Sequence, residues 1–116
     1  MNHRFYTYIT TNPSKRVLYI GMTNQLDQRI IEHYLNRGNP ETFAGKYYCY
    51  CLIYWEDFQW VHDAIAREKE LKGWTRKKKL NLIRKSNPNL NFLNKSIMPD
   101  WPPKNAQSRS APRKKN

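Results

Sequence analysis

The sequence has no apolar run that approaches the roughly 18 to 20 residues needed to span a bilayer. Its polar beginning, Met1-Asn2-His3-Arg4, lacks the apolar stretch of a secretory signal. Only two cysteines occur, Cys49 and Cys51, and no further Cys or His lies at metal-ligand spacing. Their i, i+2 spacing on an expected strand favours packing over a disulfide between them. We therefore expect a soluble, cytoplasmic protein without a membrane partner.

Acidic side chains are also scarce, since nine Asp and Glu stand against 21 Lys and Arg, for a net charge of +12. Residues 1–66 carry as many acidic as basic side chains, so the whole excess lies in residues 67–116. A solvated basic face would explain any single lysine run. Segregation on this scale favours a polyanionic partner, nucleic acid above all, because each Lys or Arg near a phosphate releases condensed counterions.

A length of 116 residues and an apolar content of 39% support one small domain with one core. We expect this domain to occupy residues 1–94. Residues 95–116 are basic and rich in proline and serine, without a core-forming pattern, so we expect a flexible tail.

Strand and helix patterns alternate along the domain. Residues 5–10 and 16–21 are β-rich and flank a turn at residues 12–14, which predicts a β-hairpin. Residues 47–55 are apolar or aromatic on both faces, which predicts a buried third strand. Three helices are predicted, one from a cap at Thr23 or Asn24 to about Asn36, one over residues 61–72 and one from Thr75 to just before Pro88.

Polar and aromatic side chains gather near the hairpin. The hairpin sets the phenols of Tyr8 and Tyr19 side by side, and Arg29 and His33 lie at i and i+4 of a predicted helix. These four groups supply the hydrogen-bond donors of a site. Aromatic residues are also favoured in strands, where most tyrosines only pack.

One acidic residue, Glu68, lies on the inward stripe of the helix predicted over residues 61–72, where an aliphatic side chain is expected. A carboxylate there is costly unless it is paired or holds a cation. The structural alternative is a salt bridge to Arg67, Lys72 or another basic side chain. The functional alternative is a metal ligand.

Together these residues resemble the GIY-YIG nuclease family, which includes the N-terminal domain of an excision-repair nuclease and catalytic domains of homing endonucleases. In detail the chain looks like the small stand-alone bacterial members. Tyr-Thr-Tyr stands where the family name implies Gly-Ile-Tyr, and Tyr8 keeps the position of the functional tyrosine. The motifs, spread over about residues 4 to 94, are Tyr6-Thr7-Tyr8, Tyr19-Ile20-Gly21, the run from Gly21 to Arg29 with Glu32-His33, the run from Ala64 to Trp74, and Asn87-Pro88.

The resemblance implies an α+β fold of order ββαβαα, with a small three-stranded antiparallel sheet flanked by about three helices. It also implies metal-dependent hydrolysis of DNA phosphodiesters with one divalent ion, Mg²⁺ or Mn²⁺. Glu68 would hold the ion and Arg29 a nonbridging phosphate oxygen. Tyr8 would act as general base if it hands its proton on, with His33 to relay or orient that proton. Tyr19 would position the water or bind phosphate.

The last site residue implied by the resemblance is Asn87, with Asn91 as a competing candidate because the sequence after Pro88 departs from related small members. Lysines are expected at the nucleic-acid backbone. These are Lys46, near the third strand, and Lys77, Lys78 and Lys79 of the third helix.

Two functions follow from these residues. The first is an endonuclease on DNA that is directed by structure or damage, because the basic helix and tail give affinity without base readout. A protein partner would then supply any further specificity. The second is a basic module that binds DNA or RNA and has lost cleavage.

Overall fold

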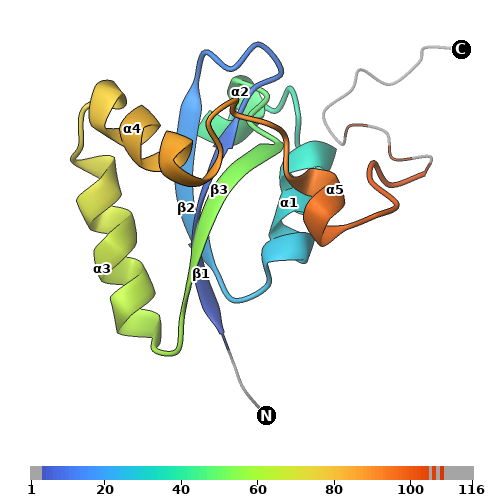
Figure 1. Cartoon of the computed structure of the whole chain (residues 1–116). Coiled ribbons are helices and arrows are strands. Elements are labelled where there is room, and N and C mark those ends of the chain that lie inside the picture. The colour runs from blue at the N-terminus through green and yellow to red at the C-terminus, as the bar shows by residue number, and fades with distance from the viewer. Residues whose placement is uncertain (1–3, 105, 107, 109–116) are drawn as a thin grey trace, which may run out of the picture.

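The structure is a computed structural model that describes residues 4–104, 106 and 108 (Figure 1). Strand β1 lies between the other two strands of an antiparallel sheet of order β2-β1-β3. The predicted α+β class and element order are confirmed, with two short additional helices, α2 and α5. The elements are β1 (Phe5–Thr11), β2 (Leu18–Thr23), α1 (Leu26–Leu35), α2 (Phe43–Lys46), β3 (Cys51–Phe58), α3 (Val61–Lys72), α4 (Arg76–Ser86) and α5 (Asn94–Ile97).

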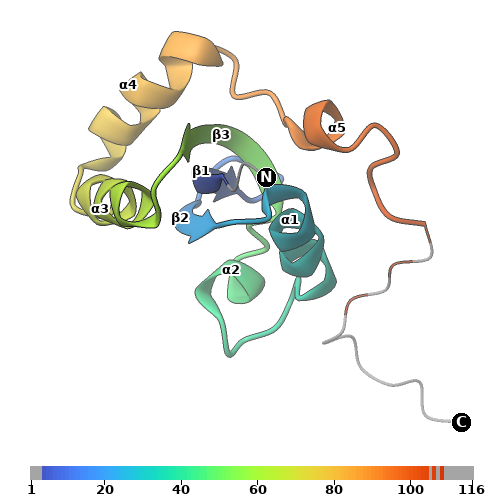
Figure 2. The same cartoon turned by 90° about the horizontal axis from the view of Figure 1, so that it is seen from below.

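Helices cover both faces of the sheet, α3 and α4 on one and α1 and α5 on the other (Figures 1 and 2). Successive side chains of β1 point to opposite faces of the sheet. Ile9 therefore packs in a core cluster with Leu71 and Ile83, whereas Tyr8 packs in a second core cluster with Ile30. Both faces of β1 are therefore buried. The full set of buried residues in the two clusters is Ile9, Ile20, Ile53, Leu71, Ile83 and Leu90 for the first, and Tyr8, Leu26, Ile30 and Leu52 for the second.

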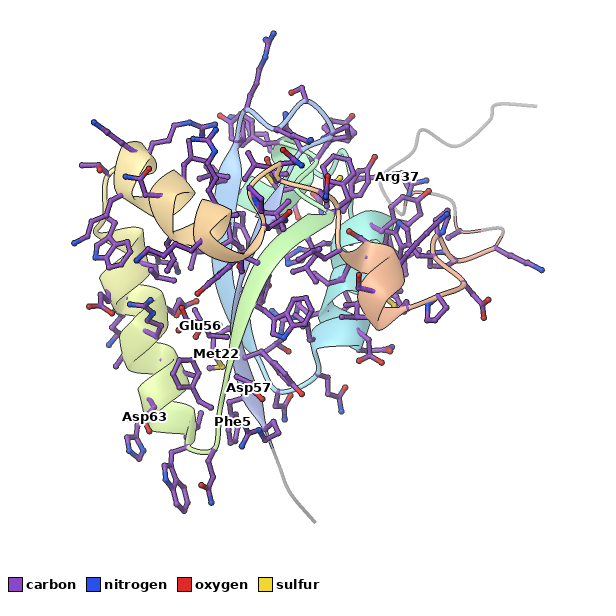
Figure 3. The ribbon with its side chains drawn as sticks, viewed as in Figure 1. Phe5, Met22, Arg37, Glu56, Asp57 and Asp63 are labelled. Atoms are coloured by element: carbon purple, nitrogen blue, oxygen red, sulfur yellow. The ribbon has the colours of Figure 1, made fainter. Side chains whose placement is uncertain are left out.

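Polar contacts fix α3 against the sheet. The buried Thr7 hydroxyl donates to the Ala64 carbonyl at 2.8 Å, and Ala64 is itself fully buried. Glu56 faces α3 (Figure 3) and accepts hydrogen bonds from two nitrogens of the Arg67 guanidinium, Nε at 3.0 and 3.2 Å and Nη2 at 2.9 Å. A bidentate pair of this kind fixes orientation as well as distance, so α3 is held in one register on β1 and β3.

The predictions for the two later helices are confirmed. Helix α3 spans Val61–Lys72, as predicted, and α4 begins after Thr75, whose hydroxyl accepts from the Lys78 amide at 3.2 Å. Gly73 caps α3 in a right-handed conformation with φ −81°, which does not require glycine. Within the described residues, no helix is both long and apolar enough to cross a membrane.

The third strand was predicted to begin at Tyr47, and this is wrong, because β3 begins at Cys51. Tyr48 has a φ of 59°, a left-handed conformation that an extended strand does not allow. Helix α2 precedes it, capped by the Thr42 hydroxyl, which accepts from the Gly45 amide at 3.0 Å. Cys49 and Cys51 are buried and free, as expected for packing residues.

The first helix was predicted to follow a cap at Thr23 or Asn24, and it begins instead at Leu26 with Gln25 as its N-cap. The Thr23 hydroxyl accepts from the Gln25 amide at 3.0 Å and so stabilises the turn from β2 into α1. Leu26 and Ile30 are buried, as predicted for the inward stripe.

Packing continues past residue 94, the predicted end of the domain. The Asn94 side chain accepts from the Leu52 amide at 2.8 Å and donates to the Tyr50 carbonyl at 2.9 Å. Met98 and Trp101 then pack against the cluster that contains Tyr8. The apolar side chains of this segment follow no helical or strand period, which is why it was predicted to be flexible. Positions 105, 107 and 109–116 of the predicted tail lie outside the described residues.

Candidate active site

Tyr8 is the centre of the candidate site. It lies on the middle strand, opposite Gly21 of β2, and its side chain is fully buried. A Cβ atom at Gly21 would lie 2.6 Å from the Cζ atom of Tyr8, so the phenol ring crosses β2 where glycine leaves room. Gly21 belongs to the Tyr19-Ile20-Gly21 motif, but its role in placing Tyr8 follows only from the strand register, which the sequence does not show.

We expect Gly21→Ala to lower the free energy of unfolding by about 1–3 kcal/mol, because the added methyl group overpacks the Tyr8 ring. The matched control is Gly73→Ala, where the nearest atom would be 3.5 Å away and φ is ordinary. That change should be neutral or stabilise by about 0.4–1 kcal/mol. Urea unfolding measures both, and equal effects of the two substitutions would contradict the assigned contact.

The Tyr8 hydroxyl and His33 Nε2 are hydrogen-bonded at 2.7 Å. Burial raises the pKa of Tyr8 well above its usual range, with smaller contributions from Tyr19 and from the charge of Glu68. Burial and the Arg29 guanidinium lower the pKa of His33 to about 4. Both groups are therefore neutral near pH 7, so the phenol donates and the imidazole accepts. The hydrogen bond therefore runs from the Tyr8 hydroxyl to His33 Nε2.

The low pKa of His33 predicts a pH-dependent stability. The pKa is about 4 in the folded chain against 6.5 for an ordinary histidine, so between these values the unfolded chain binds more protons. The free energy of unfolding should fall by about 3 kcal/mol as the pH drops from 6.5 to 4. His33→Gln should flatten this dependence in urea unfolding, whereas His62→Gln, at an exposed site, should not. Identical pH profiles for wild type and His33→Gln would contradict the burial of His33.

A pocket of about 210 Å³ lies beside this hydrogen bond. The ring of Tyr19 meets His33 edge-on at 5.2 Å between centroids and lies 6.3 Å from the ring of Tyr8. The Arg29 guanidinium also lines the pocket, 3.5 Å from the Glu32 carboxylate. The structure thus brings together the four predicted residues of the hairpin and α1. The complete lining is Tyr19, Arg29, Glu32, His33, Asn36, Thr42, Phe43 and Ala44.

Glu68 belongs to α3, and its negative charge raises the pKa of Tyr8. Its carboxylate is 3.4 Å from the Lys72 ammonium, so the salt bridge considered from the sequence is present. Lys72 is 54% exposed, and an exposed pair of this kind contributes little to stability. The other basic residue considered, Arg67, pairs instead with Glu56 and Glu70.

The donor set at Glu68 fits one hard divalent ion. Mg²⁺ takes oxygen ligands, keeps several waters and is often held by one or two carboxylates together with substrate phosphate. Glu68 offers such a carboxylate, 22% exposed, with a weakly held partner. In the part of the chain that the structure describes, no three His, Cys, Asp or Glu side chains gather as a protein-only metal cage.

Asn87 does not line the pocket beside Tyr8 and His33. Its amide donates to the carbonyls of Ile53 and Asn91, at 3.0 and 2.9 Å, and its oxygen accepts from the Asn91 amide at 2.9 Å. These bonds attach the loop after α4 to β3. Asn87 and Asn91 line a different pocket, shared with Trp55 and Pro88. The structure therefore does not bring Asn87 or Asn91 to Tyr8 and His33.

The predicted phosphate-binding lysines are divided between two regions. Lys46 ends α2, the helix that contributes Phe43 to the pocket. Lys77, Lys78 and Lys79 belong to α4, on the other side of the sheet from α1 (Figure 2). Lys78 lies over the Trp74 ring at 4.1 Å. Phe43 and Thr42 were not predicted, because they come from a loop and a single helical turn without periodicity.

A family model described as the GIY-YIG catalytic domain matches residues 4–81. The chain therefore belongs to the GIY-YIG family, and both strand motifs, Arg29, His33 and Glu68 lie within the match.

Relatives of this chain include proteins named UPF0213. The UPF0213 protein in the ldhD 5′ region of Pediococcus acidilactici is 34% identical over 80 residues, covering 69% of this chain and 81% of the relative. A UPF0213 protein of Bacillus pumilus is 37% identical over 78 residues, covering 67% and 74%. The solution NMR structure of a UPF0213 protein from Bacillus halodurans has 23% identity and a TM-score of 0.47, covering 79% of this chain and 95% of that one.

Proposed function

We propose that this protein is a metal-dependent endonuclease that hydrolyses DNA phosphodiester bonds. The observation that carries the proposal is the neutral hydrogen bond from the Tyr8 hydroxyl to His33 Nε2, beside a pocket lined by Arg29. Packing alone does not require a buried phenol and imidazole to meet a guanidinium. Membership of the GIY-YIG family supports the same reaction class.

The side chains divide the chemistry between them. Arg29 binds a nonbridging phosphate oxygen, since its planar guanidinium remains charged and matches phosphate geometry. Tyr8 takes a proton from the attacking water while its own proton passes along the 2.7 Å hydrogen bond to His33 Nε2. Tyr19, whose ring lies near those of both Tyr8 and His33, orients the water or the phosphate.

The remaining requirement is a counter-charge for the transition state and stabilisation of the leaving oxygen. A Mg²⁺ or Mn²⁺ ion held by Glu68 would supply this Lewis-acid chemistry. Lys72 would then move away from Glu68, and its exposed ammonium is able to do so. Asn87 is assigned to the loop that it binds and receives no catalytic role.

The lysines of α4 and Lys46 support a substrate that is recognised through its phosphate backbone and its shape. Lys77, Lys78 and Lys79 bind phosphates without reading bases, and Lys46 does so near the pocket. We therefore propose structure- or damage-directed action in the cytoplasm, with a protein partner for further specificity.

The alternative is a nucleic-acid-binding module, for DNA or RNA, that does not cleave. The ion pair between Glu68 and Lys72 is the observation in its favour, because it satisfies the carboxylate without a metal.

Incubation with labelled single-stranded, flapped, branched and duplex DNA, with Mg²⁺, Mn²⁺ or EDTA, distinguishes the two functions. The endonuclease cuts at least one of these DNAs with a divalent ion and none in EDTA. Binding that falls steeply with salt, without cleavage of any DNA, would favour the binding module.

A further inference from the structure

A row of aromatic rings leads from the candidate site to the surface. Buried Tyr8 lies 6.3 Å from Tyr19, whose ring is stacked with Phe43 at 6.2 Å and an interplanar angle of 26°. Phe43 in turn contacts Tyr47 at 4.8 Å. Tyr8 is fully buried, whereas Phe43 is 51% exposed and Tyr47 is 39% exposed. The outer two rings belong to helix α2 and its C-cap.

Core packing does not account for these outer rings. A large aromatic side chain that stays half exposed loses much of the free energy that burial provides. Lys46 adds a cation 5.3 Å from the centre of the Tyr47 ring. Exposed rings beside a cation, continuous with a pocket that contains an arginine, are the surface on which single-stranded nucleic acids stack their bases.

We infer that Phe43 and Tyr47 form a stacking surface for an unpaired base of the DNA strand whose phosphate enters the pocket. The inference rests on the proposed function, and it names the substrate as DNA that is single-stranded or locally unpaired beside the cut. A paired base has its faces covered by neighbours in the helix and cannot use this surface. Lys46 binds the adjacent phosphate.

Fluorescence anisotropy of the full chain tests this with a labelled single-stranded oligonucleotide and a blunt duplex, in EDTA so that neither is cut. Phe43→Ala and Tyr47→Ala should each weaken single-strand binding by about 5- to 150-fold, which corresponds to the loss of one stacked base. Duplex binding should change less than about twofold. Phe43→Leu keeps apolar volume without the aromatic face and should behave as Phe43→Ala, which separates stacking from folding.

Phe92→Ala is the matched control. Phe92 is 43% exposed and has Lys15 5.3 Å from its ring centre, but it does not line the pocket. It should leave single-strand binding unchanged.

The salt dependence of binding distinguishes a phosphate contact from base stacking. Lys46→Met should reduce the slope of log K against log salt, whereas Tyr47→Ala should not.

Equal losses on single strand and duplex, or no loss on either, would overturn the inference. A change from dimer to monomer in sedimentation, with single-strand binding intact, would assign the surface to a second copy of the chain and also overturn it. A different result would contradict the proposed nuclease function without contradicting the stacking surface. If no DNA is cut and the variants still lose single-strand binding selectively, the stacking surface holds and the nuclease does not.

Discussion

Glu68→Gln should reduce DNA cleavage by at least about 10³-fold while DNA binding in EDTA stays within about twofold of wild type. The substitution keeps the size of the side chain and removes the charge that would hold a divalent ion. The ion supplies several kcal/mol of transition-state stabilisation, and each 1.4 kcal/mol is a factor of ten in rate. Loss of the ion pair with Lys72 should lower the free energy of unfolding only slightly, because the lysine is exposed.

The control for this prediction lies two residues further along α3. Glu70 is 53% exposed and pairs with Arg67 at 2.6 Å, away from Lys72. Glu70→Gln should keep wild-type cleavage in single-turnover assays. If Glu68→Gln cleaves as fast as Glu70→Gln over a range of Mg²⁺ concentrations, Glu68 is not the metal ligand and its salt bridge is structural.

Tyr8→Phe should lower the single-turnover rate by about 10²–10⁴-fold, the usual contribution of a positioned general base. The hydroxyl is the only part of Tyr8 that the substitution removes, and it is the group that donates to His33. The phenol is fully buried, so DNA affinity should not change. Rapid-quench measurements of the cleavage step test this directly, with affinity measured separately in EDTA.

Tyr6→Phe is the control for the loss of a phenol oxygen. Tyr6 lies on the same strand and packs against the same cluster as Tyr8, but it lines a different pocket, with Leu26 and Trp55. Cleavage by Tyr6→Phe should remain near wild type. Comparable losses in both variants would mean that Tyr8 acts through packing, which is the structural alternative for a strand tyrosine.

The elements predicted correctly are those with a clear period or cap. The spacing of Ala64 and Leu71 is helical and matches α3, and Thr75 caps the start of α4. The third strand was predicted four residues too early because Tyr47 and Tyr48 have high strand propensity. Tyr48 instead adopts a left-handed conformation after α2, which strand propensity does not predict.

The same limit applies to the site. Arg29 and His33 were predictable because one helix presents both. Tyr8 and Tyr19 were predictable because a hairpin brings its two strands close in space. Phe43 reaches Tyr19 only through tertiary folding. Asn87 matches a family motif, but its hydrogen bonds go to β3 and to its own loop. Sequence motifs identified the residue types, whereas the register of the sheet decides which of them meet.

The most direct test of the account is cleavage of an end-labelled flapped DNA by wild type and by Glu68→Gln, each with Mg²⁺ and with EDTA. We expect a cut product only for wild type with Mg²⁺, with both proteins bound to the DNA in EDTA. An uncut substrate in all four reactions, despite salt-sensitive binding, would contradict the nuclease assignment. Equal cutting by both proteins in Mg²⁺ would contradict the role of Glu68.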